Sequence, residues 1–243
     1  MESKLSLIIP VFNAEVFILN SLIRLTEWRQ SVNYNVQILL VNDGSNDSTE
    51  LIINGYINTK DNSIELISYK GNQGKGYAVK TGMLTANGKY RVFTDADIPF
   101  GFEVIEKILY YLDFKEFDLC IGDRRSKKSK YFIKMNMMRR FSSSIFTMII
   151  SRYVVTGVND TQCGLKGFKA DVATKLFSKL QVKGFAFDVE ILYLSYKYEF
   201  DIKRIPVQFE GNNISTINLT KSSFLMFWNI LCLPFRYHLL KKY

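Results

Sequence analysis

The chain has 243 residues, 47% of them hydrophobic and 23% charged, which is typical of a single globular domain. Its three cysteines are odd in number and widely spaced, which excludes a disulfide framework or a zinc ribbon and favours a reducing compartment. No apolar run reaches the roughly 18 residues that a membrane-spanning helix needs. We therefore expect a cytoplasmic protein that is at most peripheral to a membrane.

The net charge of +9 is unevenly distributed. Residues 121–140 carry eight basic side chains and one acidic side chain, a local net charge of +7. Such a segment favours an anionic partner, although a charge run is often only a solvated face. The sequence pI is about 9.3, but no nucleic-acid-binding motif is present, so we expect no nucleic acid partner.

The first half of the chain alternates short β-rich runs with helical patterns. This alternation predicts an α/β fold with a mostly parallel central sheet and crossover helices. We expect strands at residues 5–9, 36–41, 64–68, 90–94 and 119–121, and helices near residues 14–28, 48–56, 75–86 and 102–112.

The second half has a different pattern. Residues 131–155 predict a long helix in which basic residues are interleaved with Phe, Met, Ile and Tyr, as in helices that lie on a membrane surface. Further helices are expected near 171–177 and 188–198, a strand at 202–209, and an aromatic helix from about residue 222. The basic and aromatic helices predict contact with a membrane surface, with packing against the sheet as the alternative.

Acidic residues follow two of the predicted strands. Asp43 comes after the second strand, and Asp95 and Asp97 end the fourth. In an open parallel sheet, ligands bind where the carboxyl ends of strands meet loops. Two carboxylates at a strand end suit Mg²⁺ or Mn²⁺, which bind through one or two carboxylates plus substrate phosphates. We therefore predict Asp95 and Asp97 as metal ligands, against the alternative of a solvated turn.

A glycine-rich loop follows the third strand. Glycines at 71, 74 and 76 match neither the dinucleotide-binding nor the P-loop spacing, which disfavours both of those enzyme classes. The loop can still bring backbone N–H groups close to a diphosphate, and Lys75 can add positive charge. A tight turn before a helix is the alternative interpretation.

Eight segments carry a family resemblance, and they occur in the order of that family. They are SLIIPVFNA (6–14), VNDGSNDST (41–49), NQGKGYAVKTGM (72–83), FTDAD (93–97), GDRR (122–125), NDTQCGLKGF (159–168), FAFDVE (185–190) and IPVQF (205–209). Together they cover about residues 5–210. The chain resembles the family 2 inverting glycosyltransferases of GT-A fold, and within them the dolichyl-phosphate and polyprenyl-phosphate glucosyltransferases and mannosyltransferases.

The resemblance implies one GT-A domain over residues 1–243. Residues 1–122 would form the nucleotide-sugar-binding half, 123–220 the acceptor half and 221–243 an amphipathic C-terminal helix. The implied reaction transfers a hexose, with glucose as the first choice, from a donor of the UDP-glucose or GDP-mannose class to a lipid phosphate. It would take place on the cytoplasmic face of a membrane.

The resemblance also implies roles for donor-side residues. Asp43 would contact the nucleotide base or ribose, with Pro10 and Phe12 as the floor beside it. Asp95 would face the ribose and the metal, and Asp97 the metal and the diphosphate. Ile-Pro-Phe follows Asp97, so no polar residue stands there as a further metal ligand. The full set of predicted donor-binding residues is Pro10, Phe12, Asp43, Gly74, Lys75, Asp95 and Asp97.

On the acceptor side, the resemblance implies that Arg124 lies near a phosphate and Asp160 near the acceptor. Asp188 and Glu190 would line the sugar side of the pocket. A lipid phosphate is already ionised and needs no strong base, whereas a sugar hydroxyl acceptor would need Asp160 or Asp188 to take its proton. A hydroxyl acceptor on a polysaccharide or glycolipid is the alternative within enzymes, and a nucleotide-sugar-binding module without turnover is the alternative outside them.

Overall fold

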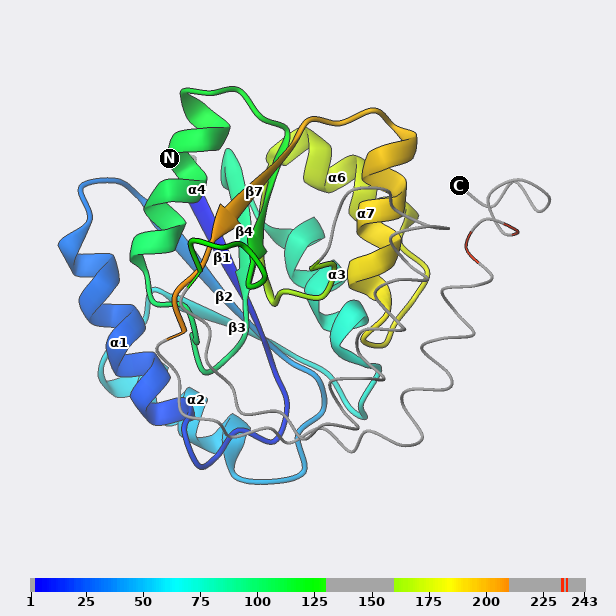
Figure 1. The fold of residues 1–243 in the computed structure, drawn as a ribbon. Helices are drawn as coiled ribbons and strands as arrows, with labels where there is room; N and C mark the ends of the chain where they lie inside the picture. Colours follow the sequence, from blue (N-terminus) through cyan, green and yellow to red (C-terminus); the bar gives the residue numbers. More distant parts are fainter. Residues whose placement is uncertain (1–2, 130–159, 210–232, 234, 236–243) are drawn as a thin grey trace.

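The computed structural model describes residues 3–129, 160–209, 233 and 235. Within these residues, seven strands form one sheet in the order β3-β2-β1-β4-β6-β5-β7 (Figure 1). The strands are β1 (Leu5–Val11), β2 (Val36–Asn42), β3 (Ile64–Ser68), β4 (Tyr90–Thr94), β5 (Leu119–Asp123), β6 (Leu165–Lys169) and β7 (Ile202–Pro206).

The sheet is mostly parallel, as predicted. Strand β1 pairs in parallel with β2 and β4, β2 with β3, and β5 with β7. Strand β6 runs antiparallel between β4 and β5. The parallel strands β1, β2 and β4 therefore deliver their following loops to the same edge of the sheet.

Helices cover both faces of the sheet (Figure 1). Helices α1, α2 and α4 pack on one face, and α3, α6 and α7 pack on the other. Strand β1 is buried along its whole length because it has a hydrophobic layer on each side, as central parallel strands do. The helices are α1 (Ile18–Ser31), α2 (Thr49–Thr59), α3 (Lys75–Thr85), α4 (Glu103–Asp113), α6 (Ala170–Lys179) and α7 (Phe187–Lys197).

Most predicted elements agree with the structure to within a few residues. The start of α1 differs, because residues 14–17 form a turn in which Ala14 N donates to Thr49 Oγ1 at 2.7 Å. The predicted strand at 202–209 ends at Pro206.

Strand β6 is missing from the sequence-based assignment. Its sequence, LKGFK, carries two lysines and a glycine and shows no hydrophobic run, yet it is buried between two other strands. The predicted helix at 131–155 lies outside the described residues, and of the predicted C-terminal helix only Leu233 and Phe235 are described. No helix in the described part of the chain is long and apolar enough to cross a bilayer.

Candidate active site

Asp43 anchors the glycine-rich loop to the end of β2. Its side chain is buried, and its Oδ1 accepts hydrogen bonds from Tyr69 Oη and Gln73 N, both at 2.8 Å. Its Oδ2 accepts a hydrogen bond from Gly74 N at 2.8 Å. Gly74 has a φ of 101°, which favours glycine, and a Cβ there would lie 2.6 Å from Lys183 O. The loop thus has a fixed path directly beside Asp43.

Pro10 and Phe12 lie next to this anchor. Pro10 pairs in register with Val41 in the neighbouring strand, and Asp43 N donates to Val11 O at 2.8 Å. Phe12 follows β1 and is 44% exposed, so an aromatic surface is available beside the buried carboxylate. This arrangement suits a stacked nucleobase, and contact with the nucleotide stays a prediction for all three residues.

Lys75, at the start of α3, forms an ion pair with Asp95 at the end of β4. Burial lowers the pKa of Lys75, but the carboxylates of Asp95, Asp188 and Asp97 outweigh burial and hold that pKa above its ordinary value. Lys75 is therefore a permanent positive charge between the glycine-rich loop and the acidic strand end.

Asp97 lies in the same acidic turn. Burial and the nearby Asp95 carboxylate raise the pKa of Asp97, although Lys75 and Arg24 oppose them. Because the pKa is raised, the two cations compensate the negative charge of Asp97 only in part. Ile98, which follows Asp97, has a φ of 49°, an uncommon conformation for a β-branched residue.

Gly164 touches this acidic turn and was not among the predicted site residues. A Cβ at Gly164 would lie 2.0 Å from Asp95 Oδ2, so only glycine leaves room for the carboxylate in its present position. A glycine immediately before a strand can indicate such a close approach of backbone to another group. That signal was available in the sequence, but it does not identify the neighbour.

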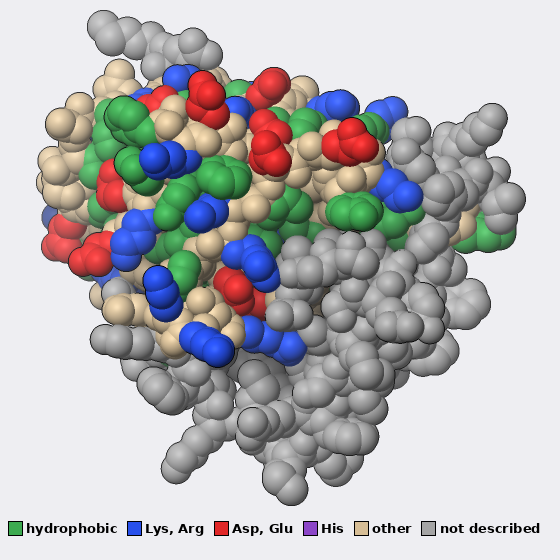
Figure 2. All heavy atoms as spheres, turned by 45° about the horizontal axis from the view of Figure 1, so that its top comes forward, with side chains coloured by type: hydrophobic (Ala, Val, Ile, Leu, Met, Phe, Trp, Pro, Cys, Tyr) green, Lys and Arg blue, Asp and Glu red, His purple; other side chains and the backbone are tan. Residues whose placement is uncertain are grey.

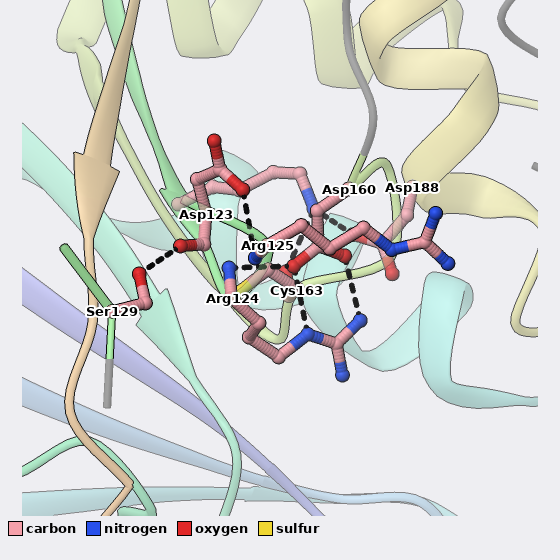
Figure 3. A network of polar contacts seen from close by, with 8 residues as sticks. Asp123, Arg124, Arg125, Ser129, Asp160, Cys163 and Asp188 are labelled. Carbon is pink, nitrogen blue, oxygen red and sulfur yellow. Dashed lines mark hydrogen bonds and ion pairs between the residues drawn. The ribbon is translucent and has the colours of Figure 1, made fainter. Parts of the chain in front are cut away.

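Arg124 and Asp160 form a two-point ion pair where β5 leaves the sheet (Figure 3). Arg124 Nε donates to Asp160 Oδ2 at 2.8 Å and Nη2 donates to Oδ1 at 2.7 Å. Burial alone would raise the pKa of Asp160, but the Arg124 guanidinium and its hydrogen bonds hold that pKa below its ordinary value. Asp160 is thus a weak proton acceptor in this arrangement.

Asp188, in the first turn of α7, pairs with the fully buried Lys166 of β6. Burial raises the pKa of Asp188, and Lys166 and Lys75 oppose that effect. Glu190, two residues further along α7, is fully buried and accepts hydrogen bonds from Gln181 N at 3.1 Å and Val182 N at 2.7 Å. Glu190 therefore shapes the loop that packs against the glycine-rich segment.

The structure brings the predicted site residues to one edge of the sheet. Asp43 binds the loop that leads into Lys75, Lys75 binds Asp95, and Gly164 connects Asp95 to the segment that carries Asp160 and Lys166. The residues linked by these contacts and their neighbours are Pro10, Phe12, Asp43, Gly74, Lys75, Asp95, Asp97, Arg124, Asp160 and Asp188. Their individual roles stay predictions.

The described residues contain no group of three or more His, Cys, Asp or Glu side chains arranged to hold a metal ion. Asp95 and Asp97 nevertheless fit a divalent cation that also binds a diphosphate, because such an ion needs only one or two protein carboxylates. Burial and, after it, the nearby Asp95 carboxylate raise the pKa of Asp97, and a cation bound to both carboxylates would offset both effects.

Part of the predicted basic cluster adjoins this site. Arg125, Lys127 and Lys128 are exposed in the turn that follows β5. On the face shown in Figure 2, the exposed Lys and Arg side chains of the described residues are interspersed with Asp and Glu. Lys130, Lys134, Arg139 and Arg140 lie outside the described residues. The predicted contact with a membrane surface is therefore untested.

The acidic turn and the glycine-rich loop lie at the carboxyl edge of an open α/β sheet, which is where proteins of this class bind their ligands. The profile of glycosyl transferase family 2 matches residues 6–177, and the chain belongs to this family. Membership confirms the family that the sequence motifs predict.

Three curated relatives share one description. The chain is 31% identical to a dolichyl-phosphate beta-glucosyltransferase of Dictyostelium discoideum, with 96% of this chain and 74% of the relative covered. It is 29% identical to the protein of the same description from Saccharomyces cerevisiae, covering 97% of this chain and 75% of the relative. For the human protein of that description the identity is 27%, covering 87% and 69%.

Solved structures support the fold. Glucosyl-3-phosphoglycerate synthase from Mycobacterium tuberculosis, in complex with Mn²⁺, UDP-glucose and phosphoglyceric acid, aligns with a TM-score of 0.69 at 15% identity, covering 95% of this chain and 79% of that chain. The same protein has also been solved with Mg²⁺ and UDP, and aligns with a TM-score of 0.65 at 14% identity, covering 96% and 78%. The fold is that of the GT-A glycosyltransferases, as predicted.

Proposed function

We propose that this chain transfers glucose from UDP-glucose to a polyprenyl phosphate of the dolichyl phosphate type, on the cytoplasmic face of a membrane to which it binds peripherally. The observation that carries the proposal is the convergence of Asp43, Lys75 and the Asp95–Asp97 turn at the carboxyl edge of the sheet. The glucosyltransferase relatives support the choice of sugar and acceptor. The UDP-glucose bound in a structure of the same fold supports the choice of nucleotide.

Three groups of residues bind the nucleotide-sugar donor in this proposal. Asp43 and the exposed ring of Phe12 bind the base and ribose, above Pro10. The Lys75 ammonium supplies positive charge for the diphosphate, while the backbone N–H groups of Gln73 and Gly74 hold the loop on Asp43. Asp95 and Asp97 hold Mg²⁺ or Mn²⁺, which when bound stabilises the negative charge on the leaving diphosphate.

The acceptor side favours an anionic nucleophile. A phosphate oxygen is ionised at neutral pH, so its attack needs orientation and not proton removal. The lowered pKa of Asp160 supports a positioning role, since an efficient general base has a pKa close to the operating pH. Arg124, with the exposed Arg125 and Lys127 nearby, supplies positive charge for the acceptor phosphate.

A sugar hydroxyl acceptor is the second candidate, and one observation favours it. The pKa of Asp188 is raised by burial, which brings that carboxylate closer to the range in which it could accept a proton. This reading is less well supported, because Lys166 already binds the same carboxylate.

Donor binding tests whether the chain uses UDP-glucose as its sugar donor. With Mn²⁺ present and a panel of nucleotide sugars, UDP-glucose is expected to raise the melting temperature most, because a ligand that binds only the native state stabilises it. Asp97→Ala is expected to lose both this shift and transfer. Full transfer activity in that variant would contradict the assigned metal ligands.

Flotation with liposomes that contain anionic lipids tests the membrane contact. The unaltered chain is expected to float, and the triple change Lys134→Ala, Arg139→Ala and Arg140→Ala is expected to reduce flotation. No flotation of the unaltered chain would contradict the peripheral attachment while leaving donor binding unaffected.

A further inference from the structure

Lys166 occupies an unusual position for a lysine. It is fully buried in β6, in register with Phe93 of β4 on one side and Ile121 of β5 on the other. Lysine is rarely buried to this degree unless its charge is compensated. Lys166 lies within the segment NDTQCGLKGF, but none of the donor and acceptor roles described above accounts for a buried ammonium in the middle of the sheet.

The Lys166 ammonium reaches from the sheet to helix α7. Its Nζ donates to Asp188 Oδ1 at 2.5 Å and to Cys163 O at 2.8 Å, and it lies 5.5 Å from the centroid of the Phe93 ring. Asp188 is itself only 4% exposed. The pair is therefore shielded from water and fixes the first turn of α7 relative to β6.

Stability alone does not explain such a pair. Replacing a buried ion pair by well-packed hydrophobic residues is often neutral or stabilising, whereas removing one partner is strongly destabilising. The location gives a better reason, because Lys166 belongs to a series of charged side chains that crosses the site. Neighbours in the series interact electrostatically and alternate in sign, in the order Asp95, Lys75, Asp188, Lys166, Asp160 and Arg124.

The charged groups facing Asp188 come from three elements: Lys166 from β6, Lys75 from α3 and Asp95 from the turn after β4. Burial and Asp95 favour the protonated form of Asp188, and the two lysines favour the ionised form. Lys75 is shared with Asp95, whereas Lys166 hydrogen-bonds Asp188 directly.

We propose that Lys166 is a positioning residue for glucose transfer, acting from the interior of the sheet to hold the Asp188 carboxylate ionised and in one orientation beside Lys75. The role rests on the proposed function, and it works through Asp188, since Lys166 is too deeply buried to touch a substrate. Deletion of this charge removes the hydrogen-bonded group that favours the ionised form of Asp188.

Lys166→Met tests this role, with Lys169→Met as the matched control. Lys169 ends the same strand and pairs with Asp118 at 3.6 Å, but its side chain is 30% exposed. For Lys166→Met, kcat/KM at pH 7 is expected to fall about tenfold, as when a group that orients other residues of a site is disturbed, because the buried Asp188 carboxylate loses the hydrogen-bond donor that favours its ionised form. The loss is expected to shrink as the pH is raised to 9. Lys169→Met is expected to retain the unaltered activity. A loss that is equal at every pH would overturn the proposal, because a purely structural defect has no such profile.

A second comparison covers the case in which the single variant Lys166→Met does not fold. In an Asp188→Asn background, adding Lys166→Met removes both members of the pair and leaves no unpaired buried charge. Transfer and affinity for UDP-glucose are expected to equal those of Asp188→Asn, because Lys166 then has no partner to hold. A further tenfold loss at an unchanged melting temperature would contradict the proposal. If the unaltered chain transfers no glucose, the proposed function fails, and the UDP-glucose affinities still test Lys166.

Discussion

Arg124 holds Asp160 through three donors on one residue: its backbone N and Nε, each 2.8 Å from Oδ2, and its Nη2, 2.7 Å from Oδ1. Both carboxylate oxygens are engaged, and the side chain is buried. An aspartate held in this way orients its neighbours and does not readily accept a proton. This relationship is the structural reason for preferring an ionised acceptor.

A pH profile of Asp160→Asn tests this interpretation. The lowered pKa of Asp160 means that the ion pair is complete above the ordinary aspartate pKa of about 4 and is lost only as the pH falls through the lowered value. We expect Asp160→Asn to reduce turnover by roughly 10-fold to 100-fold, the cost of a charge-assisted hydrogen bond, and by the same factor between pH 5 and 9. An acidic limb between pH 5 and 7 that disappears in the variant would instead identify Asp160 as a general base.

Gly164→Ala tests the contact with the acidic turn. The added methyl group would displace the Asp95 carboxylate, which can rotate away, so the fold is expected to persist. The affinity for UDP in the presence of Mn²⁺ is expected to fall about tenfold, as when the groups that orient metal ligands are disturbed. Titration calorimetry measures this change. Gly184→Ala is the matched control, because a Cβ there meets no atom within 4 Å, and an equal effect in both variants would remove Gly164 from the site.

Asp61 is expected to contribute stability that depends on pH. Its carboxylate accepts hydrogen bonds from Arg29 Nη2 at 3.0 Å and Thr26 Oγ1 at 2.9 Å, and also from Ser63. Burial alone would raise its pKa, but these partners hold the pKa below the ordinary value. We expect Asp61→Asn to lower the free energy of unfolding at pH 7 by about 1–3 kcal/mol.

The sign of the pH effect follows from the lowered pKa. The stabilisation by Asp61 is complete above the unfolded-state pKa of about 4 and is lost as the pH falls through the folded-state pKa. Urea unfolding at pH 7 and pH 3.5 is therefore expected to show a smaller difference between Asp61→Asn and the unaltered chain at the lower pH. Asp118→Asn serves as the control, since its 3.6 Å pair with Lys169 is partly exposed and contributes about 1 kcal/mol at most. An equal difference at both pH values would assign the effect of Asp61 to packing.

The first four strands were largely predictable because each of them is a local hydrophobic run followed by a helix. β3 and β4 have the predicted bounds. β6 was not predictable in this way, since its burial depends on Asp188, which lies 22 residues further along the chain and neutralises Lys166. A local pattern contains no information about such a distant counter-charge.

The residues that gather at the site could largely be predicted from the sequence. Their individual hydrogen bonds and ion pairs could not. The position of Asp43 and Asp95 after β2 and β4, the two strands on either side of β1, followed from the rule for parallel sheets. The ion pair between Arg124 and Asp160 and the close contact between Gly164 and Asp95 depend on the path of the chain around the antiparallel strand β6. These contacts join segments far apart in the sequence, and no spacing rule fixes them.

Glucose transfer to a lipid phosphate is the most direct test of the proposed function. The chain is incubated with UDP-glucose labelled in the sugar, Mn²⁺ and a polyprenyl phosphate, and the label is measured after extraction into organic solvent. We expect the label in a glucosyl lipid phosphate, formed by the unaltered chain and absent with Asp97→Ala. Label that stays in the aqueous phase, or that appears only on a soluble sugar acceptor, would contradict the central claim.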